Sequence, residues 1–241
     1  MYGVSRRRHE TLPYASLLLV QLVRLMQPRR IVFSAFGLRE GWLFDNLPES
    51  ERARDPLLAA ATGHASEVGR FGEDGLVMAD WMADLFPDEP AHLKRLRSAA
   101  CLFADIAWLD HPDYRAEHGF NHALRMPAVG IDHPGRAYVA AAVFARYGGD
   151  RDSEQIALVR KLLPREELRQ AWTAGLAMRL GLTLTGGTPS LLRQTLLVRK
   201  GKGLALLPAD AAAESMINGL EGEVTQRRVD ALTAFLEEDE V

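Results

Sequence analysis

The sequence predicts a mainly helical protein with small β elements near its two ends. Between Pro48 and about Leu182, apolar residues recur at helical spacing, and glycine and proline interrupt the pattern. Further along, two apolar runs flank Lys200-Gly201-Lys202-Gly203, which is typical of a β-hairpin whose glycines supply the turn. Near the N-terminus, the short apolar run Ile31-Val32-Phe33 precedes a glycine and another helical pattern. These three observations define the expected fold class.

The N-terminal segment predicts a helix followed by a strand. Thr11 is suited to cap a helix over 11–27, which has Pro13 in its first turn and Pro28 beyond its end. The run that follows predicts a strand over 30–34. One helix-strand unit cannot bury both of its faces, so we expect it to pack on other strands or on the helical region.

The junction after this strand is the clearest candidate for binding an anion. Gly37 is expected to turn the chain in a backbone conformation closed to other residues. The N–H groups that begin the next helix, with Arg39 beside them, would suit a phosphate or carboxylate. An alternative is that Arg39 pairs with an acidic neighbour. We assign Glu40, at the start of the same helix, to architecture because the helix dipole favours a carboxylate there.

The central and C-terminal segments predict about seven helices, a hairpin and a last helix. The alanine-rich run from Ala137 to Ala145 fits close helix packing. The hairpin is expected within 192–210, and the last amphipathic helix over about 221–237. Breaks between the central helices are expected at Gly69 to Gly72, Pro87 to Pro90, His111-Pro112, Met126 to Pro134, Gly148-Gly149 and Pro164.

Composition excludes several classes of protein. With 241 residues, 47% of them hydrophobic and 25% charged, the chain is long enough to bury a core. A formal charge of -3 argues against a dedicated nucleic-acid binder. Cys101 is the only cysteine, within the apolar helical pattern SAACLFADIAWL, so we expect no disulfides and a cytoplasmic protein. The run Leu17 to Val20 is too short for a membrane span, and no membrane is expected as a partner.

The stretch SAFGLREGWLFDNL, with RRRHETLPYASLLLVQLVRLMQPRRIVF before it, resembles the end of the actin-like domain in the exopolyphosphatase and guanosine pentaphosphate phosphohydrolase family. In that family the glycine-rich phosphate loops, a water-activating glutamate and the magnesium ligands lie upstream of this region. The resemblance therefore implies a C-terminal portion that lacks the catalytic loops and is inactive alone. Magnesium is expected for the parent enzyme, and no cofactor is expected in this chain.

The same resemblance divides the chain into three parts. Residues 1–47 would be the terminal helix-strand-helix unit of an actin-like phosphatase domain. Residues 48–182 would form an HD-like helical domain, named for a class of metal-dependent phosphohydrolases. Residues 183–241 would form a small α+β subdomain that contains the hairpin.

Four residues resemble the metal ligands of an HD-type site: His64, Asp105, His118 and His122. Such a site needs a histidine, an adjacent His-Asp pair and a further aspartate, because imidazole and carboxylate groups together fix the ion and activate its water. Here Ala104 stands where the paired histidine is expected. We therefore expect a degenerate site and no catalytic metal.

Basic residues are the better candidates for binding a ligand. Arginine forks match phosphate oxygens, and a linear polyanion is held by repeated contacts. Arg6 to Arg8 and Arg29-Arg30 could contribute to such a track. The principal anion-binding candidates are Arg39, Arg95, Arg97, Arg199, Lys200 and Lys202.

The resemblance implies a substrate-binding or dimerisation part of an enzyme that removes terminal phosphate from polyphosphate. Its expected ligand is polyphosphate or guanosine pentaphosphate, and its expected assembly is a homodimer. Two alternatives remain open from sequence. One is an HD-type metal-dependent phosphohydrolase with an atypical site, and the other is a non-catalytic helical interaction module.

Overall fold

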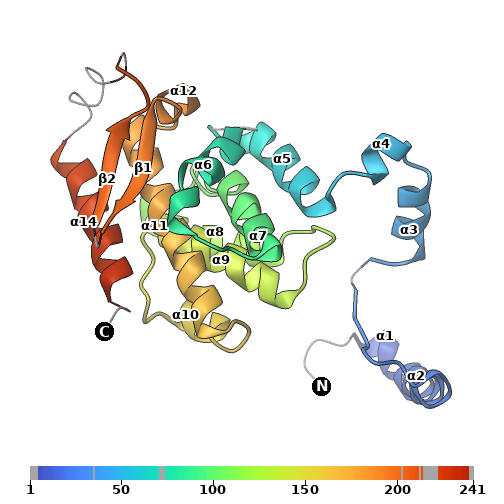
Figure 1. Cartoon of the computed structure of the whole chain (residues 1–241). Helices are drawn as coiled ribbons and strands as arrows, with labels where there is room; N and C mark the ends of the chain where they lie inside the picture. The colour runs from blue at the N-terminus through green and yellow to red at the C-terminus, as the bar shows by residue number, and fades with distance from the viewer. Residues whose placement is uncertain are drawn as a thin grey trace. The chain divides into compact units, whose positions relative to one another are not determined.

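The computed structural model describes residues 5–34, 36–70, 74–201, 203–211, 213 and 222–238. It divides into two compact units, Met1–Glu49 and Ser50–Val241 (Figure 1). Helices account for most of the described residues. The sheet among the described residues has two strands. The predicted mainly helical fold with a small β element is confirmed.

The first unit contains α1 (Arg6–His9), α2 (Leu12–Met26) and α3 (Leu38–Asp45). The short helix α4 (Glu49–Arg52) begins at the last residue of this unit and continues into the second. The predicted helix over 11–27 is confirmed as α2. It ends where Gln27 adopts a left-handed conformation with φ 43° and donates its N–H to the Val23 carbonyl oxygen at 2.9 Å. No described residue of this unit is buried.

The strand predicted over 30–34 is wrong, because these residues have no regular secondary structure. A strand is stable only when a neighbouring strand satisfies its N–H and C=O groups. The described sheet pairs only β1 (Thr195–Lys200) with β2 (Gly203–Pro208), so residues 30–34 have no such neighbour. The side chains of Val32 and Phe33 are consequently 70% and 82% exposed.

The junction before α3 also differs from the prediction. Gly37 has φ -116° and ψ -163°, an extended conformation that any residue adopts. The N-terminus of α3 is capped by a residue of the same helix, because Glu40 Oε2 accepts the Gly37 N–H at 2.7 Å. This hydrogen bond lowers the pKa of the Glu40 carboxyl. The architectural assignment of Glu40 is therefore confirmed.

The second unit is a packed bundle of helices with the hairpin and the last helix beside it (Figure 1). Its remaining elements are α5 (Pro56–Val68), α6 (Gly75–Trp81), η2 (Ala83–Leu85), α7 (Ala91–Leu102), η3 (Pro112–Tyr114), α8 (Arg115–Arg125), α9 (His133–Arg146), α10 (Glu154–Val159), α11 (Arg165–Thr185), α12 (Pro189–Leu192) and α14 (Glu223–Glu237). Apart from the early end of α7, the breaks between the central helices lie where glycine and proline predicted them.

Helix α9 forms the centre of this unit and packs against both α8 and α11. Its residues from Ala137 to Ala145 are all buried, as the alanine-rich sequence predicted. The approach to α11 is closest at Gly175. A Cβ atom at this glycine would lie 2.4 Å from the Ala142 carbonyl oxygen and 2.5 Å from the Ala145 Cβ. Small side chains therefore allow the two helices to lie almost backbone to backbone.

The helical pattern around Cys101 ends earlier than the sequence predicted. Helix α7 stops at Leu102, and residues 103–109 form successive turns. These turns place the side chain of Asp105 inside the unit, where it is 3% exposed. Buried partners for this carboxylate, described below, account for the early end of the helix.

The hairpin is confirmed with the predicted turn. Thr195 pairs with Pro208 at one end, and Lys200 pairs with Gly203 at the other. Gly201 has φ 58°, a left-handed value that favours glycine. The hairpin is fixed to α6 because Trp81 Nε1 donates to Thr195 Oγ1 at 3.0 Å. The last helix, α14, packs against α11 and β2, and it agrees with the helix predicted over about 221–237.

Among the described residues, no helix has the length and apolar character needed to cross a membrane. The predicted separation of residues 183–241 as a subdomain stays a prediction.

Candidate functional site

Asp105 is the best-defined polar centre inside the second unit. Its Oδ2 accepts hydrogen bonds from the Arg70 backbone N at 3.1 Å and from Arg70 Nε at 3.0 Å. Its Oδ1 accepts from Arg70 Nη2 and from Arg146 Nη2, both at 2.8 Å. An ionised carboxylate has about four acceptor positions, and these four bonds occupy them. Asp105 is therefore coordinated by two arginines.

Aromatic residues hold the two arginines in place. The Arg70 guanidinium lies 5.1 Å from the ring centre of Trp108, and that of Arg146 lies 3.9 Å from the ring centre of Tyr147. Trp108 Nε1 donates to the Val68 carbonyl oxygen at 2.7 Å, at the end of α5. The aspartate, both arginines and the ends of α5 and α9 thus form one network, which we call the Asp105 cluster.

The cluster keeps Asp105 ionised. Burial alone would raise the pKa of this carboxyl, but the hydrogen bond from Arg70 and the charges of Arg146 and Arg70 hold it below its ordinary value. The hydrogen bond to Asp105 raises the pKa of Arg70. Neither arginine was a candidate from sequence, since each is separated from Asp105 by more than thirty positions and no local pattern marks the pairing.

His64 lies on α5, in an early helix as predicted, and contacts a different part of the structure. Its ring centre is 5.5 Å from that of Phe103. Burial lowers the pKa of His64, the carboxylate of Glu67 opposes this, and the neighbouring His122 adds to the lowering. His64 Nε2 is buried without a hydrogen-bond partner among the described residues. This environment favours the neutral imidazole.

We expect the stability of the protein to fall as His64 becomes protonated. The folded-state pKa lies below the unfolded value of 6.5, so the unfolded state binds more protons between these two values and stability falls as the pH falls through them. His64→Gln should reduce this loss between pH 7 and pH 5. Urea unfolding at several pH values measures it, with His92→Gln on the exposed side of α7 as the reference. A profile for His64→Gln as steep as that of the wild type would contradict the prediction.

His118 and His122 share one side of α8, as their spacing predicted, with ring centres 6.4 Å apart. His118 Nδ1 lies 3.1 Å from Asp110 Oδ2, and its ring stacks on Tyr114 with ring centres 5.9 Å apart. His118 is half exposed. This arrangement is a surface pair of histidines and one carboxylate, separate from the arginines that hold Asp105.

The described residues contain no group of three or more histidine, cysteine or acidic side chains that could hold a metal ion. Ala104, at the position where the HD pattern has a histidine, is 3% exposed and belongs to the apolar core. Metal ligation needs acceptor lone pairs directed at the ion, whereas those of Asp105 face guanidinium groups. The donor set present does not fit the divalent ion of an HD-type site.

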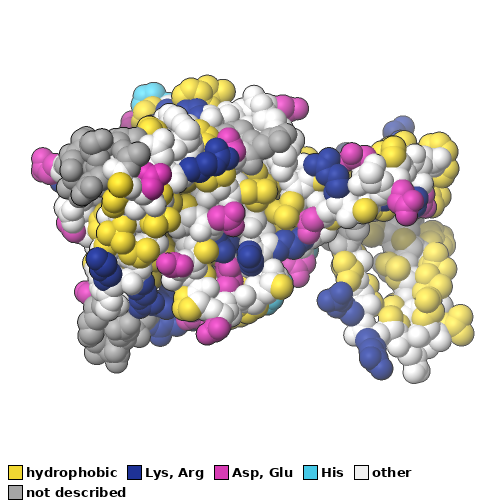
Figure 2. Space-filling model, turned by 45° about the horizontal axis from the view of Figure 1, so that its top comes forward, with side chains coloured by type: hydrophobic (Ala, Val, Ile, Leu, Met, Phe, Trp, Pro, Cys, Tyr) yellow, Lys and Arg dark blue, Asp and Glu magenta, His cyan; other side chains and the backbone are white. Residues whose placement is uncertain are grey.

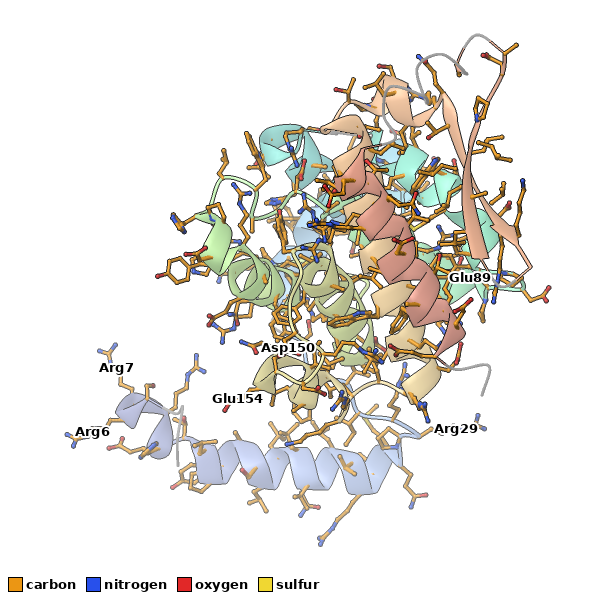
Figure 3. All side chains as sticks on the ribbon, turned by 90° about the vertical axis from the view of Figure 1, so that its left-hand side faces the viewer. Arg6, Arg7, Arg29, Glu89, Asp150 and Glu154 are labelled. Carbon is orange, nitrogen blue, oxygen red and sulfur yellow. The ribbon has the colours of Figure 1, made fainter. Side chains whose placement is uncertain are left out.

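The two candidate anion-binding arginines on α7 are engaged within the unit. Arg95 binds both carboxylate oxygens of Asp55, and its Nη2 lies 2.8 Å from Oδ1. Asp55 caps α5 through the N–H groups of the first turn. Arg97 is 2% exposed and binds Glu89, labelled in Figure 3, with Nη2 2.8 Å from Oε2. Both pairs join α7 to neighbouring segments.

The remaining candidates lie in separate parts of the chain. Arg39 is on α3 in the first unit, and Arg199 and Lys200 are exposed on β1. Lys202 lies outside the described residues. The other basic clusters do not converge either, because Arg6 and Arg7 lie at one end of α2 and Arg29 at the other (Figure 3). A role for Arg39, Arg199 and Lys200 in anion binding stays a prediction.

The second unit, a bundle of helices with a short hairpin, defines the class of this protein. The profile of the family described as "Exopolyphosphatase, C-terminal" matches residues 56–237. The chain therefore belongs to this family, as the N-terminal sequence resemblance indicated.

A curated relative extends this finding. The chain is 29% identical over 192 residues to Retrograde regulation protein 2 of Saccharomyces cerevisiae, and the match covers 71% of this chain and 31% of the yeast protein. The matched region thus spans about a third of that relative's length.

Proposed function

We propose that this chain is the non-catalytic C-terminal part of an enzyme that removes terminal phosphate from polyphosphate or guanosine pentaphosphate. In this proposal it contributes to substrate binding or to a homodimer. An actin-like domain outside this sequence supplies the catalytic loops and binds magnesium. The observation that carries the proposal is the exposed apolar surface of the first unit.

Helix α2 is apolar on most of its circumference and is not covered within its unit. Leu17, Leu18, Leu25 and Met26 are between 59% and 83% exposed, and hydrophobic side chains lie on the surface of this unit (Figure 2). A helix that is apolar on all sides is normally buried in a larger fold, and exposed patches of this kind mark interaction sites. The unit therefore needs further protein around it.

The segment after α2 supports an α/β domain as that protein. Ile31, Val32 and Phe33 have strand-forming side chains, and no other described residues pair with them as a strand. An α/β domain with an open sheet edge would satisfy their backbone groups and cover the apolar side of α2 together. Membership of the exopolyphosphatase C-terminal family, with the resemblance of residues 1–47 to the end of an actin-like domain, supports a phosphatase domain as this partner.

The Asp105 cluster supports a role without catalysis by the second unit. A metal-dependent phosphohydrolase uses carboxylate oxygens to hold an ion that activates water. In this unit the hydrogen bonds from Arg70 and Arg146 occupy those oxygens of Asp105. The cluster is thus suited to joining helices.

We expect the chain alone to release no orthophosphate from long-chain polyphosphate in the presence of magnesium. Co-expression with an exopolyphosphatase actin-like domain that lacks its own C-terminal part should yield a complex and restore release. Leu18→Glu with Leu22→Glu should prevent the complex by placing charges on the apolar side of α2. Gln21→Glu, on the same helix, is the matched control.

Size-exclusion chromatography and an orthophosphate assay measure the two outcomes. Activity of the isolated chain would contradict the proposal and favour the alternative of an atypical metal-dependent phosphohydrolase. A complex that forms without restored activity would favour the plain interaction module.

A further inference from the structure

Two histidines stand about one helical turn apart on the exposed side of α8. His118 and His122 are both exposed, whereas Gly119, Phe120 and Ala123 of the same helix are buried. Helix α8 packs against α9, and a Cβ atom at Gly119 would meet the Val143 side chain of that helix. The two imidazoles lie outside this packing and are accessible to a small ligand.

The contact with Asp110 determines which nitrogen of His118 is available. His118 Nδ1 lies 3.1 Å from Asp110 Oδ2. An ionised carboxylate only accepts hydrogen bonds, so Nδ1 carries the proton and the lone pair of the neutral imidazole is on Nε2. The Tyr114 ring stacks on the same imidazole, with ring centres 5.9 Å apart and planes 20° from parallel. Asp110 and Tyr114 thus hold His118 in one tautomer and one orientation.

The imidazole of His122 keeps its ring nitrogens for a ligand. No described residue forms a hydrogen bond with this side chain, whose ring contact is with His118. Two histidines at positions i and i+4 of a helix can bind one metal ion together. A histidine that binds a metal commonly donates its other ring N–H to a carboxylate, which fixes the ring and raises its basicity. His118, His122 and Asp110 have both of these features.

The distance between the two rings is close to the one that a shared ion requires. With metal–nitrogen bonds of about 2.1 Å, two imidazoles on one tetrahedral ion have ring centres about 5 Å apart. The ring centres of His118 and His122 are 6.4 Å apart. The rings must therefore approach each other by about 1 Å, which small rotations of two exposed side chains allow.

This pair is separate from the HD-type arrangement that the structure excludes. The carboxylate of Asp105 binds Arg70 and Arg146, and the His64 ring packs against Phe103. A site on α8 has two protein ligands, so water completes the coordination of the ion. Such a site agrees with the finding that the described residues hold no group of three or more candidate ligands.

We propose that His118 and His122 bind one divalent transition-metal ion of the class of Zn²⁺, Ni²⁺ and Cu²⁺, and that Asp110 positions His118 for this ion. Imidazole suits these ions, whereas Mg²⁺ prefers oxygen ligands and keeps several waters. The site is therefore distinct from the magnesium site proposed for the actin-like domain. The proposal does not rest on the proposed function, because all three residues belong to the second unit.

Isothermal titration of the full chain with Zn²⁺ tests the proposal. We expect one saturable site, and tighter binding of Cu²⁺ than of Zn²⁺. His118→Gln and His122→Gln should each weaken Zn²⁺ binding by about tenfold or more, because a single imidazole loses the advantage of two linked ligands. Asp110→Asn should weaken it by about tenfold, as loss of a carboxylate that orients a ligating histidine does.

Two exposed histidines on other helices provide the matched controls. His92→Gln on α7 and His133→Gln on α9 should bind Zn²⁺ within about twofold of the wild type, and circular dichroism shows that each variant is folded. Lack of saturable Zn²⁺ binding by the wild type, equally tight binding of Mg²⁺, or equal losses in the control variants would overturn the proposal. Loss of binding in His64→Gln would overturn it as well, because the ion would then belong to an HD-type site.

Discussion

Replacement of Gly175 by leucine is expected to prevent the second unit from folding, and replacement by alanine is expected to destabilise it strongly. A Cβ atom at this position would lie 2.4 Å from the Ala142 carbonyl oxygen of α9. A backbone oxygen inside a helix cannot move away by itself, so α9 and α11 would have to separate. Overpacking of a core by one or more methyl groups costs about 1–3 kcal/mol, and more where backbone must shift.

Gly63 provides the matched control because it also lies within a helix. Outside its own stretch of helix, no atom of the described residues lies within 4 Å of a Cβ built at Gly63. Gly63→Ala should therefore stabilise the protein by about 0.5–1 kcal/mol, since alanine restricts the unfolded chain and favours helix. Urea unfolding followed by circular dichroism measures both variants. A Gly175→Ala protein as stable as the wild type would show that the two helices are not in close contact.

The contact at Gly175 also affects the Asp105 cluster. The same Cβ would lie 3.1 Å from the backbone nitrogen of Arg146, the last residue of α9. Any separation of α9 from α11 therefore shifts the arginine that binds Asp105 Oδ1. The alanine-rich core and the buried ion pair are parts of one packing arrangement.

Elements defined by neighbouring residues could be predicted from the sequence. Helix α2 is marked by Pro13 and Pro28, and the hairpin by the glycines at its turn. Most breaks between the central helices follow glycine and proline in the same way, because these residues act on the local backbone.

Features that depend on distant residues could not be predicted. The strand expected at Ile31-Val32-Phe33 needs a neighbour that the described residues do not provide. The turns after Leu102 depend on Arg70 and Arg146, which are distant in sequence from Asp105. A cavity lined by four arginines brings residues of α10, α11 and their connecting loops together with Phe235 of α14. In each case a long-range contact overrides or completes the local pattern.

Replacement of Asp105 by asparagine is expected to destabilise the protein by about 3–5 kcal/mol, since it leaves a buried guanidinium without its counter-charge. Arg146 is only 11% exposed in its side chain. Asp74→Asn is the matched control, because Asp74 pairs with Arg193 at 2.6 Å but both side chains are about half exposed. Its removal should cost less than about 1 kcal/mol. Urea unfolding at neutral pH compares the two variants.

The dependence on pH separates loss of the charge from loss of side-chain packing. The folded-state pKa of Asp105 lies below its ordinary value of 3.8, so its contribution is fully present above that value and is lost as the pH falls through the folded-state pKa. The difference between the wild type and Asp105→Asn should therefore be large at neutral pH and should shrink in acid. A difference that stays constant down to the lowest pH at which both proteins fold would contradict a charge-based role. Asp105 would then act through packing alone, and its carboxylate oxygens would not be reserved for the two arginines.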